Sequence, residues 1–267
     1  MENTDRRPDS GPELVPRERP GGAELAPQEL PEEFAELVAE VSEEEAPLTR
    51  RRRLSAQISR LARRSGRAGW QGARSTSRWL TAEVLAMAPR LPVRDQQRLR
   101  AQFPGLDPDE LADALIHGAS RSAAVVGAAA GAAMVLPLPT APVEILVETV
   151  AVVGIEIKLV AELHEVYGMR APGSAADRMM AYVGAWAHRS GVALAPAGLV
   201  LVAGSPLRRR LQRRLLARAG RSTMSLGPLL TGSMFGAMLN RRETRRLGTD
   251  VRNDLRRRSP YSRHWTG

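Results

Sequence analysis

The sequence predicts an all-α fold: a helical bundle with a central apolar helical hairpin, preceded by a disordered acidic N-terminus. Composition is the first reason, because 43% of the 267 residues are hydrophobic but only 4% are aromatic. The apolar content is mostly small and aliphatic, which suits closely packed helices better than a β-sandwich. Periodicity is the second reason: apolar residues recur at helical spacing in several segments, and no segment shows the alternation typical of a strand.

Residues 1–48 are expected to be disordered. The segment is rich in proline, and its acidic residues outnumber its basic ones. Such a chain buries too little apolar surface to offset the entropy of ordering. One short amphipathic helix is predicted within it, from four apolar residues at helical spacing: Phe34, Leu37, Val38 and Val41. We expect this acidic helix to be weak in isolation.

Residues 49–90 are predicted to form a basic amphipathic helical segment. Its arginines include Arg50, Arg51, Arg52, Arg53, Arg60, Arg63 and Arg64, beside an apolar stripe of Leu54, Ile58 and Leu61. Trp70 and Trp79 follow and are candidate anchors at a membrane interface. The acidic helix before this segment either folds back on it as a clasp or merely keeps a basic protein soluble. We favour the second interpretation.

A helical core domain is predicted over residues 91–250, followed by a loose basic tail at 251–267. Its first clear helix begins at the sequence Asp107-Pro108-Asp109-Glu110. This order places an N-cap acid, a proline at the first helical position and a glutamate at the third. Two apolar stretches, 123–138 and 143–157, flank a proline-rich turn. They predict the helical hairpin.

Two further helices and one more apolar stretch complete this domain. One helix is expected to start at Ser174, with Asp177 placed to complete the cap. The other starts at Ser205-Pro206, and its basic residues include Arg208, Arg209, Arg210, Arg213 and Arg214. The last apolar stretch, 224–239, stops at Asn240. Residues 191–204 are small and apolar, and no strand is predicted there.

The hairpin is too short and too acidic to predict a clean bilayer span. A spanning helix needs about 20 predominantly apolar residues. The second arm contains Glu144, Glu148 and Glu156, which lipid accepts only when they face inward. Partial insertion from the cytoplasmic side and packing in a soluble core both stay open. For the Glu144–Glu148 pair we favour solvent-facing or inter-helix contacts over acid–base catalysis.

Two GxxxG patterns lie inside apolar stretches. Gly127 with Gly131 forms the first, and Gly232 with Gly236 forms the second. This spacing lets two helix backbones approach closely, so all four glycines are candidate helix-packing residues. The alternative is chance in a chain rich in glycine and alanine.

Several motifs between residues 107 and 250 carry a family resemblance. They are the small-residue run GAAAGAAMVLPLP followed by Glu144, the pattern Glu162-Leu163 with Tyr167-Gly168, and GSMFGAMLNRRETRRLG at 232–248. In these the chain resembles the EcsC protein family and, more distantly, helical domains found beside some bacterial GTPases. The resemblance implies a helical, membrane-associated bacterial protein and supplies no catalytic residues.

The residues that common catalytic sites require are missing. Cysteine is absent, which excludes disulfides, thiolate nucleophiles and cysteine-bound metal. The four histidines have no metal-ligand spacing, no serine lies in a GxSxG motif, and Lys158, the only lysine, lacks a phosphate-binding glycine loop. We therefore expect no enzyme, no cofactor and no metal site.

Charge indicates the class of partner. The net charge of +10 is carried almost entirely by arginine, whose guanidinium group binds phosphate in a bidentate manner. We expect the two basic helices to bind an anionic membrane surface, with a protein partner or a second copy in addition. Nucleic acid is a weaker alternative because aromatic stacking residues are scarce, and a soluble helical scaffold is another. The acidic start is unlike a signal peptide, so the cytoplasmic face of a bacterial membrane is the expected location.

Overall fold

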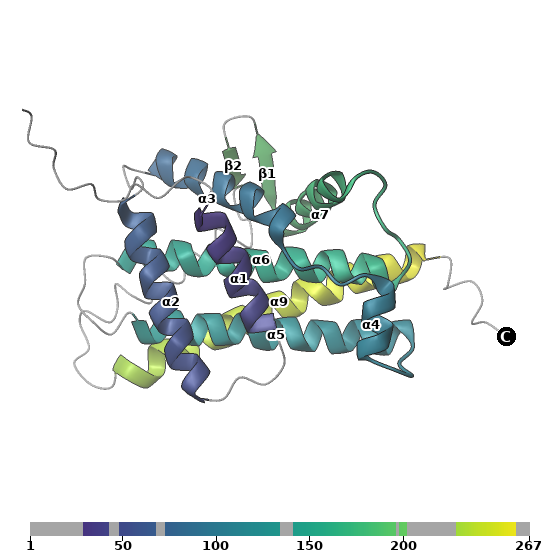
Figure 1. The fold of residues 1–267 in the computed structure, drawn as a ribbon, viewed down its shortest axis with the longest axis horizontal. Coiled ribbons are helices and arrows are strands. Elements are labelled where there is room, and N and C mark those ends of the chain that lie inside the picture. Colours follow the sequence, from purple (N-terminus) through teal and green to yellow (C-terminus); the bar gives the residue numbers. More distant parts are fainter. Residues whose placement is uncertain are drawn as a thin grey trace, which may run out of the picture.

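The protein folds as the predicted all-α helical bundle (Figure 1). The computed structural model describes residues 29–42, 48–67, 73–133, 141–195, 198–201 and 228–259. The helices are α1 (Glu29–Ser42), α2 (Leu48–Arg67), α3 (Ala73–Met87), the 3₁₀ turn η1 (Ala88–Arg90), α4 (Gln96–Gln102), α5 (Pro108–Ala133), α6 (Ala141–Val166), α7 (Ala175–Ser190) and α9 (Pro228–Arg258). The expected helix at 205–218 lies outside the described residues.

Helices α5 and α6 form the predicted hairpin. The expected cap is present: the Asp107 carboxylate accepts a hydrogen bond from the Glu110 amide at 2.8 Å, and the Glu110 carboxylate accepts one from the Asp107 amide at 3.0 Å. This reciprocal pair satisfies donors that a helix start leaves open. The helix then runs unbroken to Ala133. The predicted turn at 134–140 lies outside the described residues.

Helix α6 is the centre of the bundle. It contacts α1, α2, α3, α4, α5, α7 and α9, and every residue from Ile145 to Leu163 is buried. A helix that is apolar on all sides belongs inside a protein or a membrane. Here protein surrounds it, so the described part of this arm packs in a core. None of the described helices combines the length and the apolarity that a bilayer span requires.

Helix α1 belongs to the same core, although most of residues 1–48 were expected to be disordered. Its predicted apolar stripe, which includes Phe34 and Val38, is buried. Gly154 of α6 admits this helix closely, because a Cβ atom there would lie 2.8 Å from Val38 Cγ2. Figure 1 shows α1 and α2 crossing in front of α6. The stripe finds apolar partners on α6 that the local sequence does not reveal, so α1 is part of the core and not of a disordered segment. Residues 1–28 and 43–47 lie outside the described part.

Helix α9 is one continuous helix, which corrects one expectation. The chain after Asp250 was expected to be loose. Instead the helix continues to Arg258, with Val251 and Leu255 buried against the rest of the bundle. Arginines of its last turns pair with acids of α5: Arg252 with Asp113, and Arg256 with Asp109 at 3.2 Å. Charge pairing and two apolar contacts hold a stretch whose composition alone suggests a tail.

Helix α7 begins at the predicted cap and leads into a small sheet that was not predicted. Ser174 and Asp177 form a capping box, and Gly191 ends the helix in the left-handed conformation with φ 65°. Strands β1 (Val192–Ala195) and β2 (Gly198–Leu201) then pair antiparallel, with Val192 opposite Leu201. The sequence shows no period-two alternation here because nearly every residue is small and apolar.

One hydrophobic core joins the segments that the sequence suggested were separate. It includes Phe34 from 1–48, Ile58 from 49–90, Trp186 from the core domain and Leu255 from the expected tail. The long helices that meet in it are drawn from the whole described chain. The segment boundaries suggested by charge and composition therefore do not divide the packed core.

Candidate functional site

The expected lipid-binding arginines of α2 are only partly within the described residues. Arg60 and Arg63 are exposed, on the helix whose apolar residues Leu54, Ile58 and Leu61 are buried. The backbone of Arg50, Arg51, Arg52 and Arg53 belongs to α2, but their side chains lie outside the described part. The second basic cluster also lies outside it, namely Arg208, Arg209, Arg210, Arg213 and Arg214.

Of the two expected aromatic anchors, only Trp79 belongs to the described residues. Trp79 is half-buried and packs against the core, so much of its ring is already in contact with protein. Its role as an interfacial anchor stays a prediction, which requires the exposed part of the ring to face lipid. Trp70 lies outside the described residues.

Acidic residues of α1 share a groove with the arginines of α2. Arg64 forms an ion pair with Glu33, and Gln57 donates a hydrogen bond to Glu40 at 2.9 Å. The groove between the two helices, about 230 Å³ in volume, is lined by both carboxylates and guanidinium groups, including Glu36 and Arg60. The clasp, which the sequence analysis named but did not favour, therefore exists as a contact, and it offsets part of the positive charge of α2.

The glycine patterns mark the crossing of α5 and α9. A Cβ atom at Gly127 would lie 2.6 Å from the carbonyl oxygen of Gly236, and one at Gly236 would lie 2.8 Å from the carbonyl oxygen of Gly127. The two backbones are therefore in direct contact at one residue of each pattern. Gly131 and Gly232 belong to the same helices, but their surroundings lie outside the described part.

Two acids of α6 make hydrogen bonds to neighbouring helices. Glu148 accepts one from the Asn240 side chain of α9 at 2.9 Å. Glu156 accepts one from the Trp186 indole of α7 at 2.9 Å and one from the Thr244 hydroxyl of α9 at 3.0 Å. For Glu148 this confirms the inter-helix contact that was favoured over acid–base catalysis. The side chain of Glu144 lies outside the described residues.

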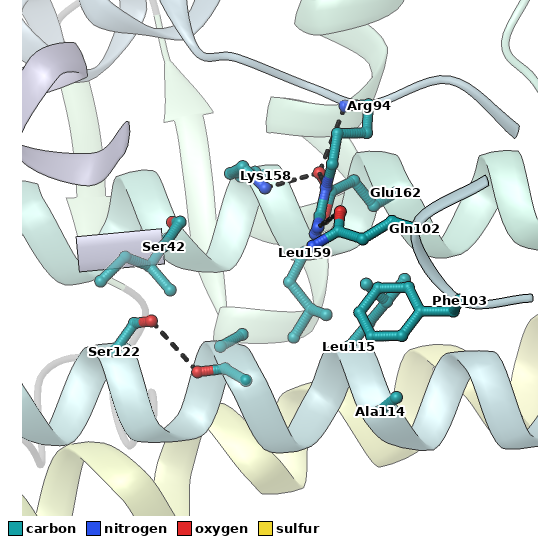
Figure 2. Close-up of a pocket in the computed structure, with 13 residues that line it drawn as sticks. Ser42, Arg94, Gln102, Phe103, Ala114, Leu115, Ser122, Lys158, Leu159 and Glu162 are labelled. Carbon is teal, nitrogen blue, oxygen red and sulfur yellow. Dashed lines mark hydrogen bonds and ion pairs between the residues drawn. The ribbon is translucent and has the colours of Figure 1, made fainter. Parts of the chain in front are cut away.

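The most strongly charged buried site is centred on Glu162 of α6. Figure 2 shows Arg94, from the segment before α4, reaching across to this carboxylate. Arg94 binds both of its oxygens, with Nε–Oε1 and Nη2–Oε2 distances of 2.8 Å, and Lys158 Nζ lies 2.5 Å from Oε1. Gln102, at the end of α4, accepts a hydrogen bond from Arg94 at 2.6 Å. One carboxylate thus binds two cations and links the segment before α4 to α6.

Burial and charge act against each other at this site. Burial by itself would raise the pKa of Glu162, but the hydrogen bonds from Arg94 and the charge of Lys158 prevail and lower it. Burial is the main cause that lowers the pKa of Lys158, and the adjacent Glu162 carboxylate opposes that shift. The adjoining cavity is only about 40 Å³ and is also lined by Phe103 and Leu115, which leaves room for a few water molecules. The arrangement links α6 to the segment before α4.

Sequence reasoning did not identify this site. Lys158 was noted as the only lysine, and Glu162 was noted as part of the family resemblance, but their contact was not inferred. Their spacing of four residues on one helix was an available signal. Arg94 lies 68 residues from Glu162 along the chain, and no local pattern connects them. Among the described residues, no group of three acids or histidines is placed to hold a metal ion.

Replacing Lys158 with methionine is expected to change the free energy of unfolding by less than about 1 kcal/mol. The variant removes a cation whose burial is costly, and it leaves Glu162 with its bidentate partner Arg94. Urea denaturation of both proteins would measure the difference. A loss of several kcal/mol would contradict the view that Arg94 alone suffices for Glu162.

Glu83 of α3 is a second buried carboxyl with an unusual environment. Its Oε1 atom is buried without a hydrogen-bond partner, and burial raises its pKa to about 7. Folding therefore favours the protonated form, and stability falls as the pH rises from the ordinary glutamate pKa toward 7. Glu83→Gln, which stays neutral, is expected to exceed wild type in stability by on the order of 1 kcal/mol at mildly alkaline pH. Denaturation across pH would show this gap close below neutrality, and a gap independent of pH would contradict the assignment.

Comparison with protein-family models, with curated proteins and with solved structures gives no significant match to this chain.

Proposed function

We propose that this protein is a non-enzymatic, peripheral membrane protein that binds anionic lipid through exposed arginines of its helices. The proposed location is the cytoplasmic face of a bacterial membrane, where a protein partner or a second copy would join it. The resemblance of residues 107–250 to the EcsC family supports a membrane surface as the place of action. Because that resemblance supplies no catalytic residues, the proposal contains no reaction.

The observation that carries the proposal is that apolar residues of the helices are buried while basic residues are exposed. On α2, Leu54, Ile58 and Leu61 are buried in the core, whereas Arg60 and Arg63 are exposed. The described part of α6 is likewise enclosed by protein. What these helices offer to a partner is therefore guanidinium groups, which suit lipid phosphates. We therefore assign the hairpin to the protein core and attachment to the membrane to the exposed arginines.

The full-length protein is expected to sediment with vesicles that contain phosphatidylglycerol and to stay in solution with vesicles of phosphatidylcholine alone. Raising the salt should release it, because the screening length falls from about 10 Å at 0.1 M to about 3 Å at 1 M. Retention at high salt would point to an inserted hairpin instead. Absence of binding to either vesicle would overturn the proposal, as would a strong preference for double-stranded DNA over anionic vesicles.

A further inference from the structure

Helix α9 has two faces of opposite character over its first half and middle. One face is turned into the bundle and includes Asn240, Thr244, Leu247 and Val251. The other is exposed and consists of Met234, Met238, Arg241, Arg242, Arg245 and Arg246. We call these six residues the α9 outer face. Their spacing places them together on one side of the helix, opposite the buried residues.

The methionines of this face are unusually exposed. Met234 is 70% exposed and Met238 is 68% exposed, whereas the other exposed large hydrophobic residues of the described chain, Leu106 and Met180, are 40% and 38% exposed. The two methionines lie four residues apart, so they form one adjacent pair. The packing of the described chain does not explain why two neighbouring, flexible apolar side chains point into solvent.

The arginines of this face lie in a part of the sequence that contains few acids. Within the described part of the chain, none of Arg241, Arg242, Arg245 and Arg246 forms an ion pair, and Glu243 is the only acid between residues 224 and 249. The arginines of α2, in contrast, share their groove with Glu33, Glu36 and Glu40 of α1. Positive charge on the α9 outer face is therefore better available to an anionic partner.

We infer that the α9 outer face is the surface that docks on an anionic bilayer, with the methionines entering the headgroup region and the arginines binding lipid phosphates. This inference rests on the proposed function and names the surface that performs it. A bilayer interface uses both halves of the face, because it offers apolar depth beside a layer of phosphate. Nucleic acid would use the arginines but would gain nothing from two projecting methionines.

The position of this face in the fold is consistent with such docking. Figure 1 shows the N-terminal end of α9 at the same end of the molecule as the last turns of α5 and the first turns of α6. The methionines belong to that end, and the arginines follow over the next turns toward the middle of the helix. The methylene groups of an arginine side chain can lie along such a surface while its guanidinium group contacts the phosphates.

The absence of cysteine allows a direct test by site-specific labelling. Met238→Cys carrying a nitrobenzoxadiazole fluorophore is expected to shift to shorter wavelength when phosphatidylglycerol vesicles are added. Met180→Cys on α7, also an exposed methionine, is the matched control and is expected not to shift. A shift at Met180→Cys without one at Met238→Cys would overturn the inference. A shift at Met238→Cys that depends on protein concentration without vesicles would also overturn it, because a second copy would then cover the face.

Charge reversal separates this inference from the proposed function. The quadruple variant Arg241→Glu, Arg242→Glu, Arg245→Glu and Arg246→Glu is expected to bind anionic vesicles at least about tenfold more weakly than wild type. The double variant Arg98→Glu and Arg100→Glu on α4, two exposed arginines away from this face, is expected to change binding far less. The opposite ranking, with circular dichroism showing both variants helical, would overturn the inference and leave the proposed function standing. Failure of wild type to bind anionic vesicles would overturn both.

Discussion

Replacing Gly127 with alanine is expected to lower the free energy of unfolding by about 3 kcal/mol. The added methyl group would lie 2.6 Å from the Gly236 carbonyl oxygen and from Asn240 Nδ2. A backbone atom cannot rotate away as the end of a side chain can, so α5 and α9 would have to separate. Separation would also strain the hydrogen bonds that Asn240 makes to Ala123 and Glu148. Chemical denaturation of the purified protein measures the loss.

Gly118 on the same helix provides the matched control. A Cβ atom there would meet no other atom within 4 Å. Alanine is favoured over glycine inside a helix by about 1 kcal/mol, so Gly118→Ala is expected to stabilise the protein. The two substitutions are chemically identical and should act in opposite directions. If Gly127→Ala were neutral or stabilising, the close crossing of α5 and α9 would be wrong.

Replacing Glu162 with alanine is expected to cost about 3–5 kcal/mol of stability. The variant removes the carboxylate that binds Arg94 through both oxygens and Lys158 through Oε1. Both cations would then lose the carboxylate they share, and Lys158 is nearly inaccessible to water. The segment before α4 would lose its main link to α6. Thermal and urea denaturation should both register the change.

An exposed ion pair serves as the control for this prediction. Glu32 of α1 lies 3.6 Å from Arg90 and is largely exposed, so Glu32→Gln is expected to change stability by less than about 1 kcal/mol. Similar effects at Glu32 and Glu162 would mean that burial does not strengthen the Glu162 contacts.

The contribution of Glu162 should also depend on pH. Its pKa is lower in the folded protein than in the unfolded chain, because its hydrogen bonds from Arg94 and the charge of Lys158 outweigh burial. The stabilisation is therefore complete above the pKa of an ordinary glutamate, about 4.3, and is lost as the pH falls through the lower folded value. The difference in stability between wild type and Glu162→Ala should shrink in acid. A difference that grew in acid would contradict this sign.

Local signals in the sequence predicted local structure well. The reciprocal hydrogen bonds of Asp107 with Glu110, and of Ser174 with Asp177, involve residues three positions apart, and both caps were predicted correctly. The apolar spacing that begins at Phe34 likewise predicted α1. Signals of this kind succeed because the interacting groups are neighbours along the chain, so their geometry follows from the helix itself.

Contacts between distant segments did not follow from sequence patterns. Arg94 was one arginine among many, and only its approach to Glu162 distinguishes it. Arg252 and Arg256 looked like part of a loose basic tail, and they are held by acids of α5. An arginine has the same chemistry whether it is paired, buried or exposed, so its role depends on what the fold places beside it.

The sequence by itself determined that the chain is helical, where several of its helices begin, that two apolar stretches flank a proline-rich turn, and that arginine supplies its charge. Each of these properties depends on single residues or on neighbours a few positions apart. Only the tertiary structure decided that the described part of α6 is enclosed by protein, that Gly127 meets Gly236, and that the arginines of the α9 outer face form no ion pair with described residues. These outcomes depend on which helix faces pack against each other and exclude water. The pattern of residues along the chain does not specify that pairing.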